Sequence, residues 1–335
     1  MNADFKNNKQ KDTIDFIIVN WNKAQTTVEL LSNLLKLETE GCNFIVVDNA
    51  SDKIDWLVLN AGLADYAPMV IKSSDINSVI NIALPKVTII RSNNNTGYAG
   101  GNNMGFRLAI RLSSNPYVWI LNNDMEIKSE GVIRNVRKVL AARSSERIVC
   151  SPPIMTPDGI IRLQTRKLNL LGLYKTKKVK ESVYRSEPHS TLPTDHLQGC
   201  SIICHKQVLL LVGFFDERFF LYNEETDWLN RCKSAGIGIF LILMDPIYHD
   251  DIFKHEMAPY KVYYKTRNSI LLTIKHGTDK FSKKFFVVGR VLYLLYLTIL
   301  IAFNSRVERI ECFKAMVAGL ADGFRGRFGI RKWDS

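Results

Sequence analysis

Three polar residues suited to chemistry, Asn122, Asn123 and Asp124, directly follow the apolar run 117–121. Magnesium and manganese ions prefer oxygen ligands, and magnesium commonly takes one or two carboxylates while phosphate oxygens and water complete its shell. Asp124 is therefore a candidate ligand for a divalent cation that holds a diphosphate. A polar turn at the end of a strand has the same composition, so both interpretations stay open for the tripeptide alone.

A second acidic motif, Glu224-Glu225, begins a helical pattern that runs to about residue 235. A positioned carboxylate can serve as a general base, but acidic residues also favour the first turn of a helix because of its macrodipole. Asp227 points elsewhere on this helix and is expected to brace its first turn. His249 follows another apolar segment, where a neutral imidazole can bind manganese or a phosphate oxygen, or simply pack.

Four apolar runs rich in β-branched and aromatic residues predict the strands that position these motifs. They are residues 16–19, 44–47, 87–90 and 117–121. A helical pattern over residues 26–37 separates the first two, and polar residues follow every run. This order predicts a doubly wound, mostly parallel sheet with a ligand crevice at the carboxyl ends of its strands.

A glycine-rich segment follows the run 87–90. Gly97, Gly100 and Gly101 would let the backbone approach a ligand closely, and Asn102 is expected to cap a helix over residues 104–112 while facing a ribose or phosphate. A glycine-rich turn is weak support alone. Its place between a strand and a helix strengthens it.

Seven stretches, in this order, together resemble family 2 glycosyltransferases, and within them the bacterial rhamnosyltransferase-like branch. They are residues 18–22 (IVNWN), 46–51 (VVDNAS), 95–103 (NTGYAGGNN), 121–124 (LNND), 213–220 (GFFDERFF), 222–228 (YNEETDW) and 263–268 (YYKTRN). No stretch is diagnostic alone, but the ordered set is specific and covers about three quarters of the chain.

The resemblance implies a GT-A fold and an inverting transferase of cell-surface polysaccharide biosynthesis. The donor would be a dTDP- or UDP-sugar, such as a rhamnose donor, and the acceptor a saccharide carried on polyprenyl diphosphate. The resemblance also implies Mn2+ or Mg2+ as the cofactor, with Asp124 and His249 as its ligands. Glu225 is the expected base, and Glu224 can share that role.

The resemblance assigns further side chains to the donor. Asp48 would accept a hydrogen bond from the imide edge of uracil or thymine, unless it caps a helix after Ser51. Arg267 is a candidate clamp for the diphosphate, with a structural salt bridge as the alternative. Trp21 and Trp228 could stack on a sugar or base, but the core is the expected place for both. The full set of donor-binding candidates is Asn20, Asp48, Asn49, Gly97, Gly100, Gly101, Asn102, Asn123 and Arg267.

Two positions depart from the family's pattern. Asn122 stands where many relatives have an acid, so metal affinity would depend on the donor phosphates. Glu225 stands where the family usually has Asp, which moves the carboxylate by roughly 1.5 Å, and a misplacement of about 1 Å can cost on the order of a hundredfold in rate.

The second departure keeps open a catalytically impaired nucleotide-sugar-binding or scaffold protein. A nucleotidyltransferase is a further alternative, but Asn20-Trp21-Asn22-Lys23 is not the glycine-rich phosphate loop that such an enzyme needs after its first strand.

Length and composition fit this hypothesis. The chain has 335 residues, of which 46% are hydrophobic, enough for a substantial core. We expect one catalytic domain over residues 14–270 and a basic, helical extension over 271–335. Residues 60–86 are expected to be a surface insertion. The polar start predicts a cytoplasmic chain, and six cysteines without a Cys-x-x-Cys pair predict reduced, buried thiols.

The net charge of +12 predicts an anionic partner: a nucleotide diphosphate, nucleic acid or a membrane surface. Cations gather in residues 162–185 and near the C-terminus without interleaved stacking aromatics, which argues against nucleic acid. The stretch 162–185 is expected to be a solvated flexible loop, or a lid or membrane-facing loop.

Residues 285–303 are apolar except for Arg290 and Thr298, and as a helix they would be about 28 Å long. They could span a bilayer, lie in its interface or pack on the catalytic domain. We expect a peripheral protein on the inner face of the cell membrane.

Overall fold

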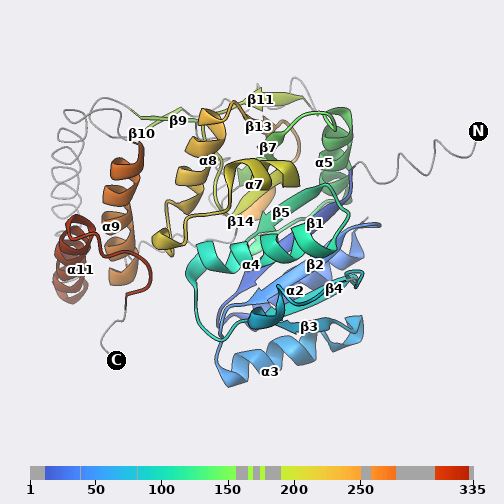
Figure 1. Ribbon diagram of the computed structural model, residues 1–335, viewed down its shortest axis with the longest axis horizontal. Helices are drawn as coiled ribbons and strands as arrows, with labels where there is room; N and C mark the ends of the chain where they lie inside the picture. The colour runs from blue at the N-terminus through green and yellow to red at the C-terminus, as the bar shows by residue number, and fades with distance from the viewer. Residues whose placement is uncertain are drawn as a thin grey trace, which may run out of the picture.

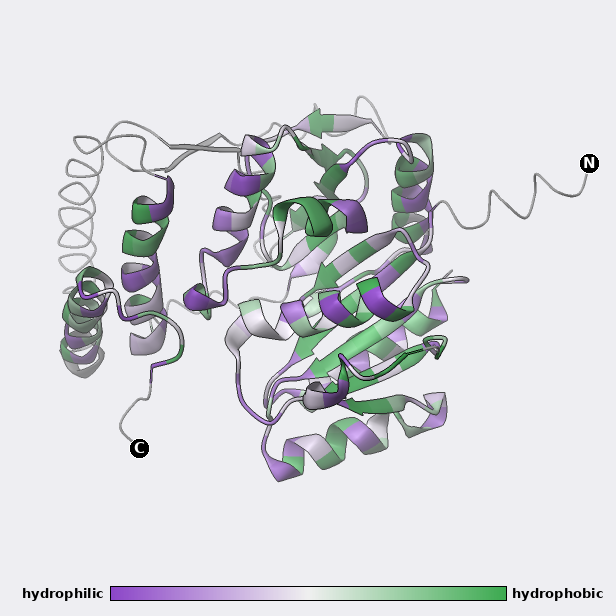
Figure 2. Cartoon of the chain, viewed as in Figure 1, coloured by the Kyte–Doolittle hydropathy of each residue, from purple (hydrophilic) through white to green (hydrophobic). Residues whose placement is uncertain are grey.

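The computed structural model describes residues 12–37, 39–80, 82–155, 165–168, 174–177, 190–249, 258–276 and 306–331. A nine-stranded sheet forms its centre, with helices on both faces (Figure 1). The strand order is β11-β13-β7-β12-β5-β1-β2-β4-β3. Green, hydrophobic residues run along the central strands in Figure 2, while the helices carry purple residues on their outer surfaces.

Each predicted strand is present at the centre of the sheet. These strands are β1 (Ile14–Asn20), β2 (Asn43–Asp48), β4 (Val87–Arg91) and β5 (Tyr117–Leu121). β1 pairs in parallel with both β2 and β5, and β2 with β4. The strands are almost continuously apolar because helices bury both of their faces. The prediction of a mostly parallel, doubly wound sheet is confirmed.

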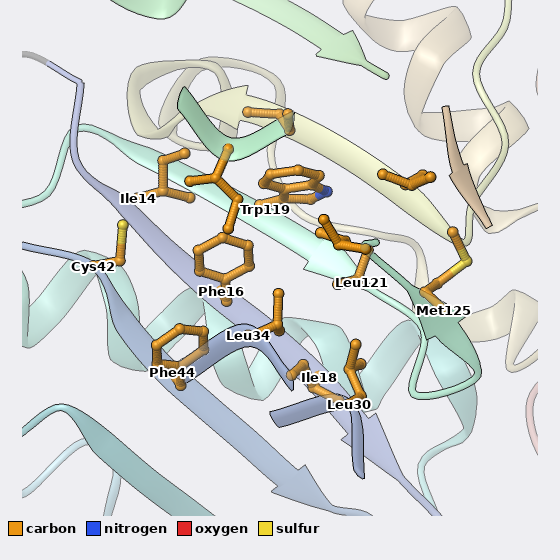
Figure 3. Close-up of a cluster of buried hydrophobic side chains, with 14 of the residues drawn as sticks. Ile14, Phe16, Ile18, Leu30, Leu34, Cys42, Phe44, Trp119, Leu121 and Met125 are labelled. Atoms are coloured by element: carbon orange, nitrogen blue, oxygen red, sulfur yellow. The ribbon is translucent and has the colours of Figure 1, made fainter. Parts of the chain in front are cut away.

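Two clusters of apolar side chains fill the space between the sheet and its helices. On one face, α2 (Ala24–Lys36), α3 (Lys53–Gly62) and α5 (Glu130–Ala142) cover a cluster in which Phe16 stacks on Phe44 and Trp119 (Figure 3). On the other face lie α4 (Gly97–Leu112), α7 (Lys206–Val212) and α8 (Glu224–Ser234).

The helix after the glycine-rich segment begins earlier than predicted. α4 starts at Gly97, so Asn102 lies inside it and donates from Nδ2 to the carbonyl of Tyr98, which corrects its predicted role as a cap. The glycines serve packing here. A Cβ atom on Gly101 would lie 2.9 Å from the side chain of Val19, and one on Gly105 would lie 2.4 Å from that of Ile17. Their absence lets α4 lie close against β1.

Two predicted loops contain strands instead. Within residues 60–86, β3 (Met69–Lys72) pairs in parallel with β4 and extends the sheet, so this segment is more than a surface insertion. Within the basic stretch, β9 (Thr165–Leu168) and β10 (Tyr174–Lys177) form an antiparallel pair. The rest of residues 162–185 lies outside the described part of the chain.

Antiparallel pairing completes the other side of the sheet. β12 (Ser201–His205) runs antiparallel to β5 and to β7 (Ile148–Ser151), and β13 (Gly238–Ile242) joins β7 to β11 (Thr191–Pro193). A separate small sheet consists of β6 (Met125–Glu126), β14 (Ile247–His249) and β8 (Ile154–Met155). Its register sets His249 opposite Met125.

Two helices at the C-terminal end, α9 (Pro259–His276) and α11 (Arg306–Phe324), pack side by side (Figure 1). Gly319 lies so close to α9 that a Cβ atom there would come within 2.7 Å of the carbonyl oxygen of Tyr263. The predicted domain boundary at residue 270 falls inside α9. Residues 285–303 lie outside the described part, and no described helix is long and apolar enough to cross a membrane.

All six cysteines are buried and free, as predicted.

Candidate functional site

A cavity of about 670 Å3 opens where β1, β2 and β5 end. One wall comes from the predicted donor motifs and the other from the C-terminal half of the chain. The residues on the first wall include Trp21, Lys23, Asn49, Asn95, Gly97, Tyr98, Asn122 and Asn123. Those on the second include Phe220, Leu221, Tyr260, Tyr264, Ile330 and Arg331.

Asn49 shapes the first wall. Its Nδ2 donates to the carbonyl of Gly97 (3.0 Å) and to Oδ1 of Asn95 (3.1 Å), while its Oδ1 accepts from the backbone N–H of Thr96 (3.0 Å). These bonds hold the turn that leads into α4 against the end of β2. Gly97 has a φ of 71°, a left-handed value that suits glycine.

Asp48 and Asn20 lie behind this wall, and both are fully buried. Asn20 donates from Nδ2 to Oδ1 of Asp48 (3.1 Å), and Arg91 forms an ion pair with the other carboxylate oxygen. The helix after Ser51 is capped by Asp52, whose carboxylate accepts from the N–H of Asp55, so the alternative of Asp48 as the cap is wrong. A uracil or thymine ring that binds Asp48 must share the Asp48 carboxylate with Arg91.

The small sheet brings Asp124 and His249 together. His249 Nε2 lies 3.1 Å from Asp124 Oδ1, and the two border a second cavity of about 410 Å3 that shares Asn123 with the first. Burial favours the neutral acid, but the hydrogen bond and charge of His249, together with Lys23, hold the pKa of Asp124 below its usual value. Asp124 is therefore an ionised carboxylate.

Glu224 and Glu225 start α8, as predicted. The Glu224 side chain is buried, and its Oε2 has no hydrogen-bond partner among the described residues. Burial, and then the charge of Glu225, raise the pKa of Glu224 well above its usual range. Glu225 is partly buried and accepts from the hydroxyl of Thr226 (3.1 Å).

The glutamate pair stands next to the cavity wall without lining it. Tyr98 lines the cavity, and its hydroxyl donates to the carbonyl of Gly199 (2.6 Å), whose Cα in turn lies against the side chain of Glu225. The charges of Glu224 and Glu225 reach Tyr98 and contribute, after burial, to raising the pKa of its phenol.

Asp227 braces α8, as expected from its position. Its carboxylate contacts Nε of Arg231 (3.0 Å) one turn later in the same helix. It also contacts Lys275 (2.7 Å) and His276 (2.8 Å) at the end of α9. Asp227 therefore fixes α8 to α9 as well as bracing the first turn.

Arg267 does not reach the cavity. Its side chain is 1% exposed and donates to the carbonyls of Gly329, Arg218 and Phe219. Neither the predicted diphosphate clamp nor its salt-bridge alternative is seen for Arg267 among the described residues. Its guanidinium forms hydrogen bonds to backbone carbonyls instead. Of the two tryptophans expected in the core, Trp228 is buried, whereas Trp21 is 54% exposed and lines the cavity.

Residues 15–153 match the model of the family described as Glycosyl transferase family 2. This match and the two relatives that follow identify the chain as a family 2 glycosyltransferase. The chain is 24% identical over 326 residues to the low-salt glycan biosynthesis hexosyltransferase Agl10 of Haloferax volcanii, covering 95% of this chain and 93% of that protein. It is 23% identical over 330 residues to the dTDP-rhamnosyl transferase RfbF of Shigella flexneri, covering 95% and 98%.

Solved structures show that the glycosyltransferase has the GT-A fold. A mannosyltransferase from Pyrobaculum calidifontis, solved with GDP-Man and Mn2+, aligns with a TM-score of 0.53 at 10% identity, over 94% of this chain and 87% of that one. GalNAc-T7, solved with UDP, GalNAc and Mn2+, aligns with a TM-score of 0.55 at 14% identity, over 83% of this chain but only 54% of its own.

Asp124 and His249 fit a divalent metal of the kind bound in those structures. An ionised carboxylate and an imidazole are both ligands of Mn2+, and a shell with few protein ligands is completed by phosphate and water. In the described part of the glycosyltransferase, no third His, Cys, Asp or Glu joins them. That donor phosphates contribute to metal binding stays a prediction.

Sequence reasoning missed the second wall. Tyr260, Tyr264, Ile330 and Arg331 come to the cavity because α9 packs against α11 and the chain then turns back, with the N–H of Arg331 donating to the hydroxyl of Tyr264 (3.0 Å). The one local signal was the pair of tyrosines in the stretch 263–268.

Glu224→Gln should stabilise the glycosyltransferase, and the gain should grow with pH. The folded protein keeps a proton on Glu224 because its pKa is raised, whereas the unfolded chain releases it above an ordinary glutamate pKa of about 4.3, so stability falls as pH rises through this window. The neutral amide removes that loss. Thermal unfolding at about pH 5 and pH 8 should show a larger gain at the higher pH.

The exposed Glu146 provides a control, because Glu146→Gln should show no gain that grows with pH. An equal gain from Glu224→Gln at both pH values would contradict a raised pKa.

Proposed function

We propose that this glycosyltransferase moves a hexose or deoxyhexose, such as rhamnose, from a dTDP- or UDP-sugar to a saccharide carried on polyprenyl diphosphate. The observation that carries the proposal is a pair of cavities at the strand ends that share Asn123, one lined by the donor motifs and the other by the Asp124–His249 pair. The hexosyltransferase and dTDP-rhamnosyl transferase names of its relatives support this donor class. The product would be a cell-surface glycan.

The donor would lie against the first wall. Trp21 exposes a ring on which a base or sugar can stack, and the turn held by Asn49 offers backbone groups to the nucleotide. Asp48 would meet the imide edge of the base only once Arg91, which pairs with its buried carboxylate, makes room. Asp124 and His249 would hold Mn2+ or Mg2+, which neutralises charge on the departing diphosphate when bound.

Glu225 is the proposed base that takes the proton of the acceptor hydroxyl. Glu224 is disfavoured because burial and the neighbouring Glu225 raise its pKa, which favours the neutral acid over the base. A catalytically impaired binding or scaffold protein is the second candidate, since Glu225 replaces the usual Asp. The two differ in donor turnover, because a binder would gain thermal stability from the nucleotide sugar without releasing nucleoside diphosphate.

We further propose that the C-terminal extension docks on the inner face of the cell membrane. The outer face of α11 exposes Ile310, Phe313, Val317 and Phe324. Lys314, Arg325 and Arg327 lie alongside as exposed cations. An apolar stripe with adjacent cations suits the interface of an anionic bilayer, where a lipid-linked acceptor would be found.

A panel of nucleotide sugars with Mn2+ tests the donor and its metal. A dTDP- or UDP-sugar should raise the unfolding temperature, since a ligand at 100 times its Kd adds about 2.7 kcal/mol to the free energy of unfolding, and nucleoside diphosphate should be released. Asp124→Asn should abolish Mn2+-dependent binding and turnover while the ligand-free protein unfolds at a similar temperature. Unchanged Mn2+-stimulated activity would remove Asp124 from the site.

Glu225→Gln should lower kcat by about two to four orders of magnitude with donor affinity nearly unchanged, because the amide keeps the shape and loses the basicity. Glu224→Gln should have a smaller effect, and Glu225→Asp should keep or raise the rate by restoring the family's shorter reach. Steady-state release of nucleoside diphosphate measures all three. A larger loss from Glu224→Gln would assign the role of base to Glu224. No loss from either variant would favour a catalytically impaired nucleotide-sugar-binding protein.

The glycosyltransferase should sediment with vesicles that contain phosphatidylglycerol and be only partly released by salt, because salt screens charge but leaves apolar burial. Phe313→Asp with Val317→Asp should weaken binding. The control is Ile54→Asp with Leu57→Asp, which changes two exposed apolar residues on α3. Full release by salt would indicate charge alone, and equal loss in both double variants would contradict docking through α11.

A further inference from the structure

The turn before Glu224 has an unusual backbone. Phe220, Tyr222 and Asn223 have φ values of 63°, 69° and 71°, in the left-handed region that residues other than glycine seldom adopt. Such a conformation is strained and persists only where its surroundings hold it. The turn, residues 219–223, must therefore be held by other parts of the protein.

This turn joins the components of the candidate site. Phe220 and Leu221 line the cavity, and Asn223 directly precedes Glu224. The carbonyl of Phe220 also accepts from the N–H of Ala99 (3.3 Å) in the first turn of α4. A Cβ atom on Gly97 would come within 2.2 Å of that same oxygen, so the turn and the glycine-rich segment touch directly.

Asn268 supplies the strongest restraint on the turn. It is fully buried in α9, and its Nδ2 lies within hydrogen-bonding distance of three carbonyl oxygens, those of Phe219 (2.8 Å), Leu221 (2.7 Å) and Tyr222 (2.8 Å). One side-chain amide therefore lies close to three backbone carbonyls of the turn. The Oδ1 of Asn268 accepts from Arg267, which fixes the orientation of this amide.

The residues around Asn268 contact the same turn. The Arg267 guanidinium donates to the carbonyl of Phe219 (2.9 Å), the Tyr264 ring stacks on Phe220 with centroids 5.1 Å apart, and Lys265 lies 4.9 Å from the ring centroid of Tyr222. Arg267 also donates to the carbonyl of Gly329, next to Ile330 in the cavity wall. One side chain thereby ties the turn to the C-terminal segment.

We propose that residues 264–268 form a clamp that positions the turn and, through it, the Glu224–Glu225 pair and the Phe220–Leu221 wall. The inference rests on the proposed function for the role of Glu225 as base. Arg267 and Asn268 are positioning residues, because they are buried away from the cavity and act through the turn. The clamp explains why two stretches far apart in the sequence, 219–225 and 264–268, serve one site.

Loss of the clamp should affect the rate more than donor binding. Without the Asn268 amide the turn is free to leave its left-handed conformation, and α8 begins immediately after it. A displacement of about 1 Å at a reacting group can cost on the order of a hundredfold in rate. The nucleotide-facing wall, which Asn49 holds independently, keeps its geometry.

The test compares Asn268→Ala with Thr273→Ala, which removes a different hydrogen bond of α9, from the buried Thr273 hydroxyl to the carbonyl of Ser269 (2.7 Å). Asn268→Ala should lower kcat for release of nucleoside diphosphate about 10- to 100-fold, with the thermal shift produced by UDP or dTDP nearly unchanged. Thr273→Ala should lower the unfolding temperature but keep kcat. If Asn268→Ala also loses only stability, its role is structural and the proposal is overturned.

A rescue variant makes the test specific to the turn. Asn223→Gly removes the cost of the left-handed conformation at that residue, so Asn268→Ala with Asn223→Gly should recover several-fold of the lost rate. No recovery, with the turn unchanged in amide hydrogen exchange, would overturn the proposal. Should Asn268→Ala not fold, Asn268→Ser, whose hydroxyl still donates one hydrogen bond, replaces it with the same expected order of rates.

Amide hydrogen exchange over residues 219–227 separates this inference from the proposed function. If the wild-type protein turns over none of the nucleotide sugars, the proposed function fails. Faster exchange of the turn in Asn268→Ala than in Thr273→Ala would still support the clamp. Equal exchange in both variants would overturn it, whatever the activity.

Discussion

The parallel pairing of β1 with β2 and β5 is the constraint on which the rest of the site depends. Parallel neighbours end at one edge of the sheet, so the polar residues after each strand meet there although they are distant in the sequence. Burial of both faces by helices makes the strands apolar and leaves their ends as the place for polar groups. Gly101 and Gly105 contribute by letting α4 lie close against β1. The cavity opens at this edge.

Two contacts between distant parts of the chain bring further side chains to the site at the sheet edge. Pairing of β6 with β14 sets His249 beside Asp124, and the contact of α9 with the turn 219–223 sets the start of α8 beside the cavity. Both contacts use short elements that have little stability alone. They persist because larger elements on either side hold them, which is how a site can contain a strained backbone.

Acidic groups around the cavity differ in charge because their surroundings differ. Asp227 is buried and Asp124 is partly buried, but both have cationic or imidazole partners, so the pKa of each carboxyl lies below its usual value despite desolvation. Glu224 is buried beside another acid, so its pKa is raised. The surroundings therefore separate these acids: burial beside Glu225 favours the proton on Glu224, whereas their partners favour the charged forms of Asp124 and Asp227.

The sequence by itself determined the central strands, the start of α8, the buried thiols and the glycosyltransferase family, because hydrophobic periodicity and ordered motifs are local properties. It did not determine that α4 starts at Gly97 or that β3 joins the sheet, since short elements gain their stability from packing. Only the tertiary structure placed Arg267 among backbone carbonyls instead of in the cavity, and Ile330 and Arg331 in its wall. The reason is physical: where a side chain points depends on which carbonyls, rings and helices surround it, and those come from distant parts of the chain.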